Sequence, residues 1–282
     1  MLNKPITILN GTEVAKVHEL ALSTKISTLS TKPHLVIIQV GNNPASAKYI
    51  EYKKRFALRV GAIVTHTQYE DNITEDELVK NIKTYSNDKS VNGIIVQLPL
   101  PKTIRPWIIL DAIDPKKDVD GLTSFNLRHV YENNEILLPA TTKGIFTLLS
   151  HYNISLDGKN VVVVGRSSLV GKPTALASIN RNATVTICHS HTKDLASITR
   201  TADILIVAAG NPGLIKEEYI KEGAVIVDVG ISVGDDNKVT GDVMASSISE
   251  KADALSPVPG GVGPMTIVSL FENLLQAYEM QN

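Results

Sequence analysis

The sequence predicts an α/β protein of two domains, each built on parallel strands with crossover helices, the second being doubly wound and Rossmann-like. Three observations support this fold class. The first half of the chain alternates apolar, strand-like runs with amphipathic, helix-like segments, as βαβαβ units do. The second half repeats the alternation, with a glycine-rich turn, GRSSLVGKP, after its first apolar run. The 282 residues suffice for two ordinary domains. We place the boundary between residues 121 and 122 and expect an active-site cleft between the domains.

The first domain is predicted to contain strands linked by helices. The apolar run HLVIIQV is its first clear strand, and an amphipathic helix containing Lys53 follows within residues 41–61. Thr74 and Glu77 form a capping-box pattern that begins a further helix. The predicted elements are an amphipathic segment at 12–30, strands at 34–40, 62–69 and 91–98, and helices at 74–86 and 103–113.

The second domain follows the same alternation. Its predicted strands span 159–165, 183–188, 203–209 and 224–230, its helices span 171–180, 192–201, 216–221 and 267–280, and a polar hairpin is expected at 234–237. The segment PVPGGVGP, residues 257–264, is predicted to be a shaped loop, because its prolines lack N–H donors and its glycines admit positive φ. The helix at 265–282 is expected to return to the first domain.

Composition excludes several classes of function. The formal net charge is −1, so no global field recruits nucleic acid or anionic lipid. The N-terminus lacks the apolar core of a signal peptide, and no run of about 18 apolar residues occurs. A single cysteine, Cys188, excludes an intramolecular disulfide. We therefore expect a cytoplasmic protein that binds neither membranes nor nucleic acid.

Lys53 lies in the middle of the helix stripe that is predicted to face the interior of the protein. At 100° per residue this stripe also contains Ser46, Tyr49, Ile50, Phe56, Ala57 and Val60. A lysine in that position either extends its ammonium group to solvent or sits in a partly desolvated pocket. In the second case its pKa falls and its neutral amine can act as a base. Tyr49, one turn earlier, points the same way and can hydrogen-bond to Lys53 or to a ligand.

Polar residues follow the strands that neighbour this helix. Gln97 ends an apolar run immediately before Leu98 and Pro99, and ligands of open parallel sheets bind beyond the carboxyl ends of the strands. Gln97 either satisfies nearby backbone groups or joins Lys53 in one crevice. In the later run KKDVDG, Asp118 and Asp120 either form a solvated turn or place one carboxylate in the cleft.

The glycine-rich turn of the second half predicts a dinucleotide site. Gly165 and Gly171 enclose five residues between a buried strand and a helix, whose N-terminus offers free N–H groups to phosphate. The turn is not the GxGxxG fingerprint. The exit of the next strand reads CHSH and has no carboxylate to bind a ribose 2′-hydroxyl, and Arg166 can neutralise a 2′-phosphate. NADP is therefore favoured over NAD.

A metal site is not expected. His189 and His191 alternate as metal ligands on a strand can, but the sequence offers no evident third ligand beside them.

Taken together, these motifs resemble the bifunctional methylenetetrahydrofolate dehydrogenase/methenyltetrahydrofolate cyclohydrolase family. The matching runs occur in family order from about residue 40 to the C-terminus: VGNNPASAKYIEYKK, VNGIIVQLPLP, PKKDVDGLTSFN, GRSSLVGKP, ATVTICHSHT, VDVGI and SPVPGGVGPMT. The resemblance implies NADP-dependent oxidation of 5,10-methylenetetrahydrofolate, followed by hydrolysis of the methenyl product to 10-formyltetrahydrofolate. It also implies a homodimer that serves one-carbon metabolism, with folate bound by the N-terminal catalytic domain, residues 1–121, and NADP by the Rossmann-like domain, residues 122–282.

The resemblance also assigns residues to roles. Lys53 matches the catalytic lysine, Tyr49 a tyrosine that stacks near the folate, Gln97 the glutamine that tunes the lysine, and Asp120 the aspartate that holds the pterin ring. The remaining implied substrate contacts are Val96, Leu98, Pro259, Gly260, Gly261, Val262 and Gly263. The implied cofactor contacts are Gly165, Arg166, Ser167, Ser190 and Ile231.

The chain departs from the family pattern at two places, and three alternative functions remain open. The chain has Pro139-Ala140-Thr141-Thr142 where relatives often have Pro-Cys-Thr-Pro, and Ser232 where many have asparagine. A monofunctional dehydrogenase is the first alternative. An NADP-dependent dehydrogenase of a small carbonyl or amino acid is the second, and a non-catalytic dinucleotide sensor is the third.

Overall fold

The computed structural model describes residues 6–233, 238–248 and 251–282. Its contacts divide the chain into two compact units. Residues 16–140 and 267–282 form the unit that contains Lys53, here called the lysine unit. Residues up to Ala15 and 141–266 form the unit that contains the glycine-rich turn, here called the glycine-turn unit. The predicted hairpin at 234–237 lies outside the described residues.

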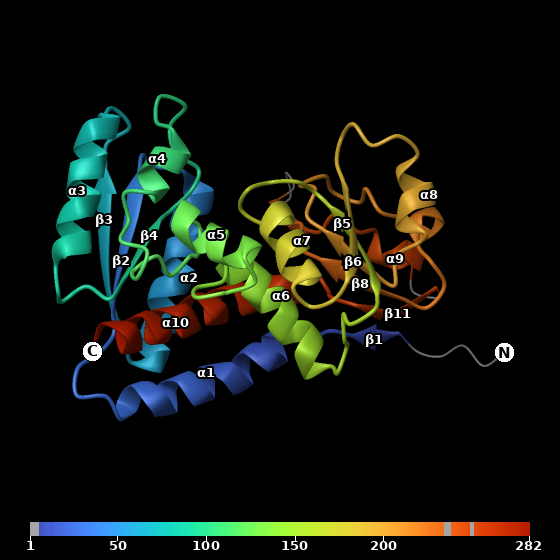
Figure 1. Ribbon diagram of the computed structural model, residues 1–282, viewed down its shortest axis with the longest axis horizontal. Coiled ribbons are helices and arrows are strands. Elements are labelled where there is room, and N and C mark those ends of the chain that lie inside the picture. The colour runs from blue at the N-terminus through green and yellow to red at the C-terminus, as the bar shows by residue number, and fades with distance from the viewer. Residues whose placement is uncertain (1–5, 234–237, 249–250) are drawn as a thin grey trace. The chain divides into compact units, whose positions relative to one another are not determined.

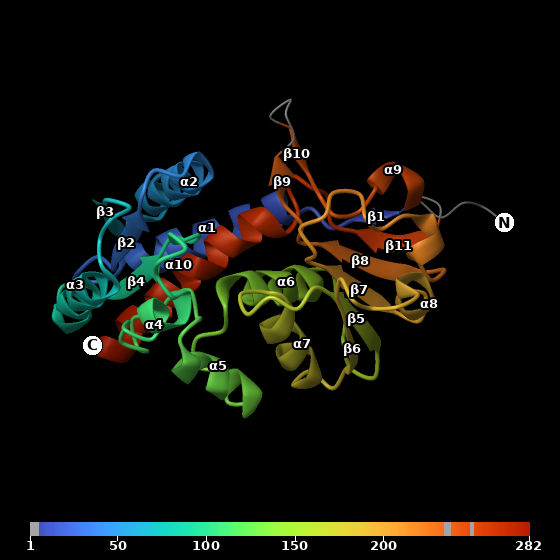
Figure 2. The same ribbon diagram turned by 90° about the horizontal axis from the view of Figure 1, so that it is seen from above.

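The lysine unit is built on a parallel sheet in the order β3-β2-β4 (Figure 1). Its strands are β2 (His34–Val40), β3 (Ile63–Tyr69) and β4 (Gly93–Val96), and β2 is buried along most of its length. The helix α2 (Pro44–Val60) covers one face and α3 (Glu75–Asn87) covers the other (Figure 2). Since all three strands are parallel, their carboxyl ends meet at one edge of the sheet.

Three further helices complete the lysine unit. These are α4 (Pro106–Leu110), α5 (Ser124–Tyr131) and most of the C-terminal helix α10 (Val262–Gln281). The amide of Asn273 on α10 donates to the carbonyl oxygens of Val119 and Leu138 at 3.0 and 2.9 Å, and Phe271 packs against Phe56 of α2 with ring centroids 4.9 Å apart. The helix α1 (Gly11–Ser27) begins in the glycine-turn unit and continues in the lysine unit.

The glycine-turn unit contains a six-stranded parallel sheet in the order β1-β11-β8-β7-β5-β6. The strands are β1 (Thr7–Ile8), β5 (Asn160–Val164), β6 (Thr184–Cys188), β7 (Ile204–Val207), β8 (Ala224–Asp228) and β11 (Ala252–Leu255). The helices are α6 (Ala140–His151), α7 (Gly171–Ile179), α8 (Leu195–Thr199) and α9 (Ala245–Ile248), with a 3₁₀ turn at Glu217–Tyr219. A small antiparallel pair joins β9 (Ser232–Val233) to β10 (Val239–Thr240).

The two-domain α/β prediction is confirmed, with differences in individual elements. The expected loop at 257–264 is wrong over its last three residues, because α10 begins at Val262. Pro264 is tolerated in the first turn of that helix, where no backbone N–H is required. The helices α5 and α6 were not predicted, and the expected helix at 103–113 is limited to Pro106–Leu110.

Candidate active site

Helix α2 brings Lys53 to the carboxyl end of the lysine unit's sheet. The helix begins at Pro44, and the side chain of Asn43 accepts the backbone N–H of Ser46 at 3.2 Å as a cap. Ser46, Ile50, Phe56, Ala57 and Val60 are buried, as the predicted stripe requires, whereas Tyr49 and Lys53 are only partly buried. Lys53 Nζ donates to Gln97 Oε1 at 3.0 Å. The structure therefore joins two of the predicted site residues directly.

The orientation of the Gln97 amide is fixed by its second hydrogen bond. Its Nε2 donates to the carbonyl oxygen of Leu98 at 2.9 Å, so Oε1 must be the atom that faces Lys53. Ser46 Oγ donates to the same carbonyl oxygen at 3.3 Å. Val96, the last residue of β4, is buried next to Gln97. These contacts present an amide oxygen to the lysine ammonium at the end of β4.

Electrostatics in this region match proton-transfer chemistry. Burial lowers the pKa of Lys53, and the nearby charge of Asp120 partly opposes that shift. Burial also raises the pKa of Asp120, against the effect of Lys53 and in the same direction as Asp118. The pKa of Tyr49 is raised by burial and by Tyr52. Lys53 and Asp120 thus interact in surroundings that favour the neutral form of each.

The two aspartates of KKDVDG have different environments. Asp118 is fully buried, and its carboxylate accepts the backbone N–H groups of Leu122 and Thr123 and the side-chain amide of Asn126, at 3.2, 2.8 and 2.8 Å. Asp120 is partly exposed and is the carboxylate that influences the pKa of Lys53. Asp118 therefore shapes the turn, and Asp120 remains the site candidate.

The predicted substrate loop belongs to the glycine-turn unit and is anchored there by the start of α1. Thr12 N donates to the carbonyl oxygen of Gly260 at 2.9 Å, and Gly261 N donates to that of Pro257 at 2.7 Å. Gly260 has a φ of +107°, and a Cβ on Gly11 would collide with the carbonyl oxygen of Gly261. Pro259 is exposed, Gly261 and Val262 are buried, and Gly263 lies in the first turn of α10.

The glycine-rich turn is closely packed. Gly165 has a φ of +136°, and a Cβ there would meet the carbonyl oxygen of Ala208. A Cβ on Gly171 would likewise meet the carbonyl oxygen of Gly165. The prediction of free N–H groups at the start of α7 is wrong for Val170, Gly171 and Lys172. The first two donate to Ser167 Oγ, at 3.2 and 3.3 Å, and Lys172 N donates to the carbonyl oxygen of Ser167 at 3.0 Å.

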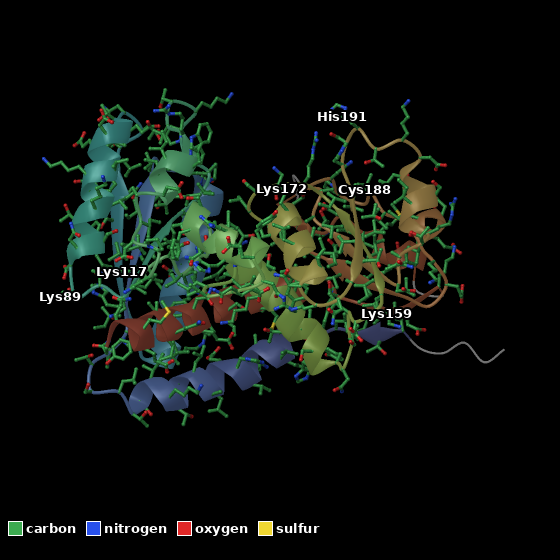
Figure 3. The ribbon with its side chains drawn as sticks, viewed as in Figure 1. Lys89, Lys117, Lys159, Lys172, Cys188 and His191 are labelled. Atoms are coloured by element: carbon green, nitrogen blue, oxygen red, sulfur yellow. The ribbon has the colours of Figure 1, made fainter. Side chains whose placement is uncertain are left out.

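The surroundings of this turn fit NADP. Arg166, Ser167 and Ser190 are exposed, and Ile231 is 45% exposed. The residues directly after β6, from His189 to Thr192, contain imidazole and hydroxyl groups: His189 N donates to Thr192 Oγ1 at 2.8 Å, and His191 N donates to His189 Nδ1 at 3.2 Å. The carboxylate of this loop, Asp194, caps α8 by accepting the backbone N–H of Ser197 at 3.2 Å. Figure 3 shows Cys188 at the end of the strand, His191 in the following loop and Lys172 at the start of α7. The exposed guanidinium of Arg166, with the imidazole and hydroxyl groups that follow β6, suits a 2′-phosphate.

Sequence reasoning missed a pair of buried carboxylates at the ends of β7 and β8. Asp228 accepts the backbone N–H groups of Gly230, Asp242 and Val243 at 2.9 to 3.1 Å. Asp242 in turn accepts those of residues 209–211 at 2.6 to 2.8 Å. Burial raises the pKa of Asp228 to about 6, against these donors. Asp228 and Asp242 therefore hold in place the loop after β7, the backbone at Gly230 and the backbone at residues 242–243. In the sequence, the signal for this pair is limited to the acidic residues within VDVGI and TGDV.

Metal-ligand clusters and membrane-spanning helices are both absent from the part of the chain that the structure describes. Among the residues that the structure describes, no three His, Cys, Asp or Glu side chains are grouped as metal ligands. Likewise, none of the described helices has the length and apolar character to span a membrane.

Comparisons with known proteins identify the family. Residues 9–120 match the model of the tetrahydrofolate dehydrogenase/cyclohydrolase catalytic domain, and residues 139–282 match that of the NAD(P)-binding domain of the same family. The chain is 50% identical over 243 residues to the bifunctional protein FolD of Agathobacter rectalis, covering 86% of this chain and 87% of that protein.

Solved structures agree with the sequence match. The bifunctional enzyme FolD of Campylobacter jejuni superposes with a TM-score of 0.95 at 40% identity, covering 98% of this chain and 99% of that one. The Trypanosoma brucei enzyme, solved with NADP cofactor and inhibitor, gives a TM-score of 0.94 at 33% identity, with 98% of both chains covered. The chain therefore belongs to the tetrahydrofolate dehydrogenase/cyclohydrolase family.

Proposed function

We propose that this protein oxidises 5,10-methylenetetrahydrofolate with NADP and hydrolyses the resulting methenyl cation to 10-formyltetrahydrofolate, with Lys53 as the proton-transfer group. Family membership over nearly the whole chain supports the two reactions. The observation that carries the role of Lys53 is its hydrogen bond to Gln97 in surroundings that lower its pKa.

The oxidation depends mainly on positioning. Bound NADP supplies the acceptor for the hydride that leaves the methylene carbon. The protein must therefore hold the nicotinamide of NADP and the methylene carbon of the folate close together and correctly oriented. We assign NADP binding to Gly165, Arg166, Ser167, Ser190 and Ile231. The glycines allow close backbone approach, and Arg166 offers the charge that a 2′-phosphate requires.

The hydrolysis needs a base. Water adds to the cationic methenyl carbon, and the neutral amine of Lys53 takes one proton from that water. The added hydroxyl then gives its remaining proton to N5 of the folate as the bond from the carbon to N5 breaks and the formyl carbonyl forms. Lys53 afterwards releases its proton to solvent, so the sum is one water consumed and one proton released. Gln97 holds Lys53 Nζ in place. Asp120 binds the pterin ring, and Tyr49 stacks beside it. Further folate contacts are assigned to Val96, Leu98 and the loop from Pro259 to Gly263.

Lys53→Met tests the proposal, with Lys83→Met as its matched control because Lys83 is an exposed lysine on α3 of the same unit. Hydrolysis of methenyltetrahydrofolate should be abolished in Lys53→Met and unchanged in Lys83→Met. Both variants should keep the circular dichroism of the parent and bind NADP normally. Near-normal hydrolysis by Lys53→Met would remove Lys53 from the mechanism.

The monofunctional alternative is distinguished by a coupled assay. With methylenetetrahydrofolate and NADP as substrates, a bifunctional enzyme accumulates 10-formyltetrahydrofolate while methenyltetrahydrofolate stays low. A monofunctional dehydrogenase accumulates NADPH and methenyltetrahydrofolate together.

The assembly and location of the protein are part of the same proposal. We assign it to the cytoplasm as a homodimer, by analogy with its family. Light scattering of the purified protein at micromolar concentration should give twice the mass of the 30.5 kDa chain.

A further inference from the structure

A chain of hydrogen bonds runs from Lys54, next to Lys53, to the loop in front of helix α2. Lys54 Nζ contacts His66 Nδ1 at 3.0 Å, and His66 Nε2 contacts Gln39 Oε1 at 3.0 Å. Gln39 Nε2 then reaches the carbonyl oxygen of Gly41 at 3.0 Å. The chain crosses from α2 to β3, then to β2, and ends where β2 leaves the sheet, all within the lysine unit (Figure 1). Gln39 is only 2% exposed.

The donors and acceptors in this chain are determined by its two ends. The carbonyl oxygen of Gly41 only accepts, so Gln39 must turn its NH₂ group toward it and its oxygen toward His66. The Nε2 of His66 must therefore carry a proton, which leaves Nδ1 as the acceptor for the Lys54 ammonium, itself only a donor. With donors running from Lys54 through His66 and Gln39 to the Gly41 oxygen, every group in the chain has a partner. This arrangement requires His66 to be neutral.

The hydrogen-bond chain ends at Gly41, in the loop between β2 and α2. Gln68 Nε2 also donates to the Gly41 oxygen, at 2.9 Å, and Gly41 N donates to the carbonyl oxygen of Tyr69 at 2.9 Å. Gly41 has a φ of +74°, and a Cβ there would collide with Asp71. This glycine is three residues before the start of α2. The N-terminal end of the helix that carries Lys53 is thus fixed to β2 and β3.

Adjacent lysines hold α2 on two sides. Lys53 bonds to Gln97 after β4, and Lys54 bonds to His66 in β3, the strand on the opposite side of β2. Consecutive side chains on a helix diverge by about 100°. Bonds from both residues to opposite edges of one sheet therefore restrict rotation of α2 about its own axis. Such rotation would move Lys53 Nζ away from Gln97.

We propose that Lys54, His66 and Gln39 are positioning residues that hold Lys53 in place for the hydrolytic step. This inference rests on the proposed role of Lys53. The three residues act through α2 and its leading loop, and none of them is assigned a contact with folate or NADP.

Protonation of His66 breaks the chain. An imidazolium has no acceptor at Nδ1 and repels the Lys54 ammonium. The groups that face the ring are Lys54 from α2 and the neutral amide of Gln39 from β2, while Thr65 and Thr67, its chain neighbours, bond on the other face of β3 to His34 and Tyr85. Burial and the charge of Lys54 lower the pKa of His66, which favours the neutral, bonded form at neutral pH.

The test compares two activities within each variant. Lys54→Met and His66→Phe both break the chain, Lys54→Arg keeps a cationic donor, and Lys83→Met removes a lysine charge elsewhere in the unit. Loss of folded enzyme lowers both activities equally, whereas misplacement of Lys53 lowers hydrolysis more than hydride transfer. We expect the ratio of cyclohydrolase to dehydrogenase kcat to fall about tenfold in Lys54→Met and His66→Phe. Lys54→Arg should retain most of the ratio, and Lys83→Met all of it.

A second measurement does not depend on activity. The pKa of Lys53 can be followed by NMR of isotope-labelled lysine, with Lys53→Met used for assignment. In His66→Phe, which leaves the charge of Lys54 in place, the pKa of Lys53 should rise toward its ordinary value as the side chain leaves its pocket. If the parent enzyme hydrolyses methenyltetrahydrofolate and neither the ratio nor this pKa changes, the positioning role is overturned. If the parent has no folate activity, the proposed function fails, and the pKa in His66→Phe alone supports or refutes the positioning role.

Discussion

The difference between Asp118 and Asp120 leads to a sharp prediction about stability. Asp118→Asn and Asp120→Asn are the same isosteric change two residues apart. In Asp118→Asn, one carboxylate oxygen becomes an NH₂ group facing a buried donor. That orphaned donor costs about 2 kcal/mol, and the remaining bonds, now to a neutral acceptor, lose about 0.5 to 1 kcal/mol each. The free energy of unfolding should therefore fall by about 3 to 4 kcal/mol.

Asp120→Asn should behave in the opposite way. Burial raises the pKa of Asp120 above its ordinary 3.8, so the folded protein binds a proton there more tightly than the unfolded chain does. Ionised Asp120 consequently destabilises the fold at neutral pH, where the group is charged in the unfolded state. Replacing it by a neutral amide should leave stability unchanged or slightly increased.

Urea unfolding measures both changes. Trp107, the single tryptophan of the chain, is 64% exposed and changes its surroundings little on unfolding, so far-ultraviolet circular dichroism is the signal to follow. With a typical slope for urea, Asp118→Asn should lower the midpoint by about 1 to 2 M. A loss below about 1 kcal/mol in Asp118→Asn, or equal losses in both variants, would refute the assignment of Asp118 to the turn and Asp120 to the site.

Three further predictions concern ligands and pH. Asp120→Asn should weaken folate binding more than NADP binding in equilibrium titrations, and equal weakening would make Asp120 a structural residue. The kcat for hydrolysis should rise with pH through the pKa of Lys53, which burial places below 10.5. At saturating folate, Asp120→Asn should move this rise to lower pH, because the carboxylate charge that raises the pKa of Lys53 is gone; a shift to higher pH would contradict the coupling. Arg166→Ala should narrow the preference for NADP over NAD in kcat/KM, and an unchanged preference would exclude Arg166 as the partner of the 2′-phosphate.

The helical repeat and the topology of parallel sheets predicted the central contact of the site. The stripe on α2 follows from the helical repeat, and the meeting of Lys53 with Gln97 follows from parallel strands that end at one edge of a sheet. Both arguments need only the chain's local pattern and one rule of topology. The structure accordingly shows the lysine bonded to the amide oxygen.

Features that depend on the geometry of a turn or on contacts between separate elements were not predictable in this way. Asp118 and Asp120 both lie in the polar run KKDVDG, and the sequence does not show which of them the turn uses. Their roles differ because the turn brings the backbone N–H groups of Leu122 and Thr123 back to Asp118. His66 lies in an alternating polar run, and its role depends on the register that sets β3 beside β2 and on the approach of Lys54.

The unpredicted helix α6 has a similar cause. Gly144 in its interior weakens helix propensity, yet a Cβ there would lie 2.9 Å from the backbone of Met265. The glycine is required by the close approach of α10, which no local pattern reveals.

The division of the chain into two units has a consequence for synthesis on the ribosome. Neither unit is continuous in sequence: β1, at Thr7–Ile8, pairs with β11 near residue 254, and the lysine unit includes residues 267–282. The sheet of the lysine unit is translated before residue 100. Phe271, which packs against α2, and Asn273, which donates to the carbonyl oxygens of Val119 and Leu138, are made much later. The usual order, in which an N-terminal domain folds while the rest of the chain is still being made, is therefore closed to this protein. Both units reach their final contacts only after residues 252–282 have left the ribosome.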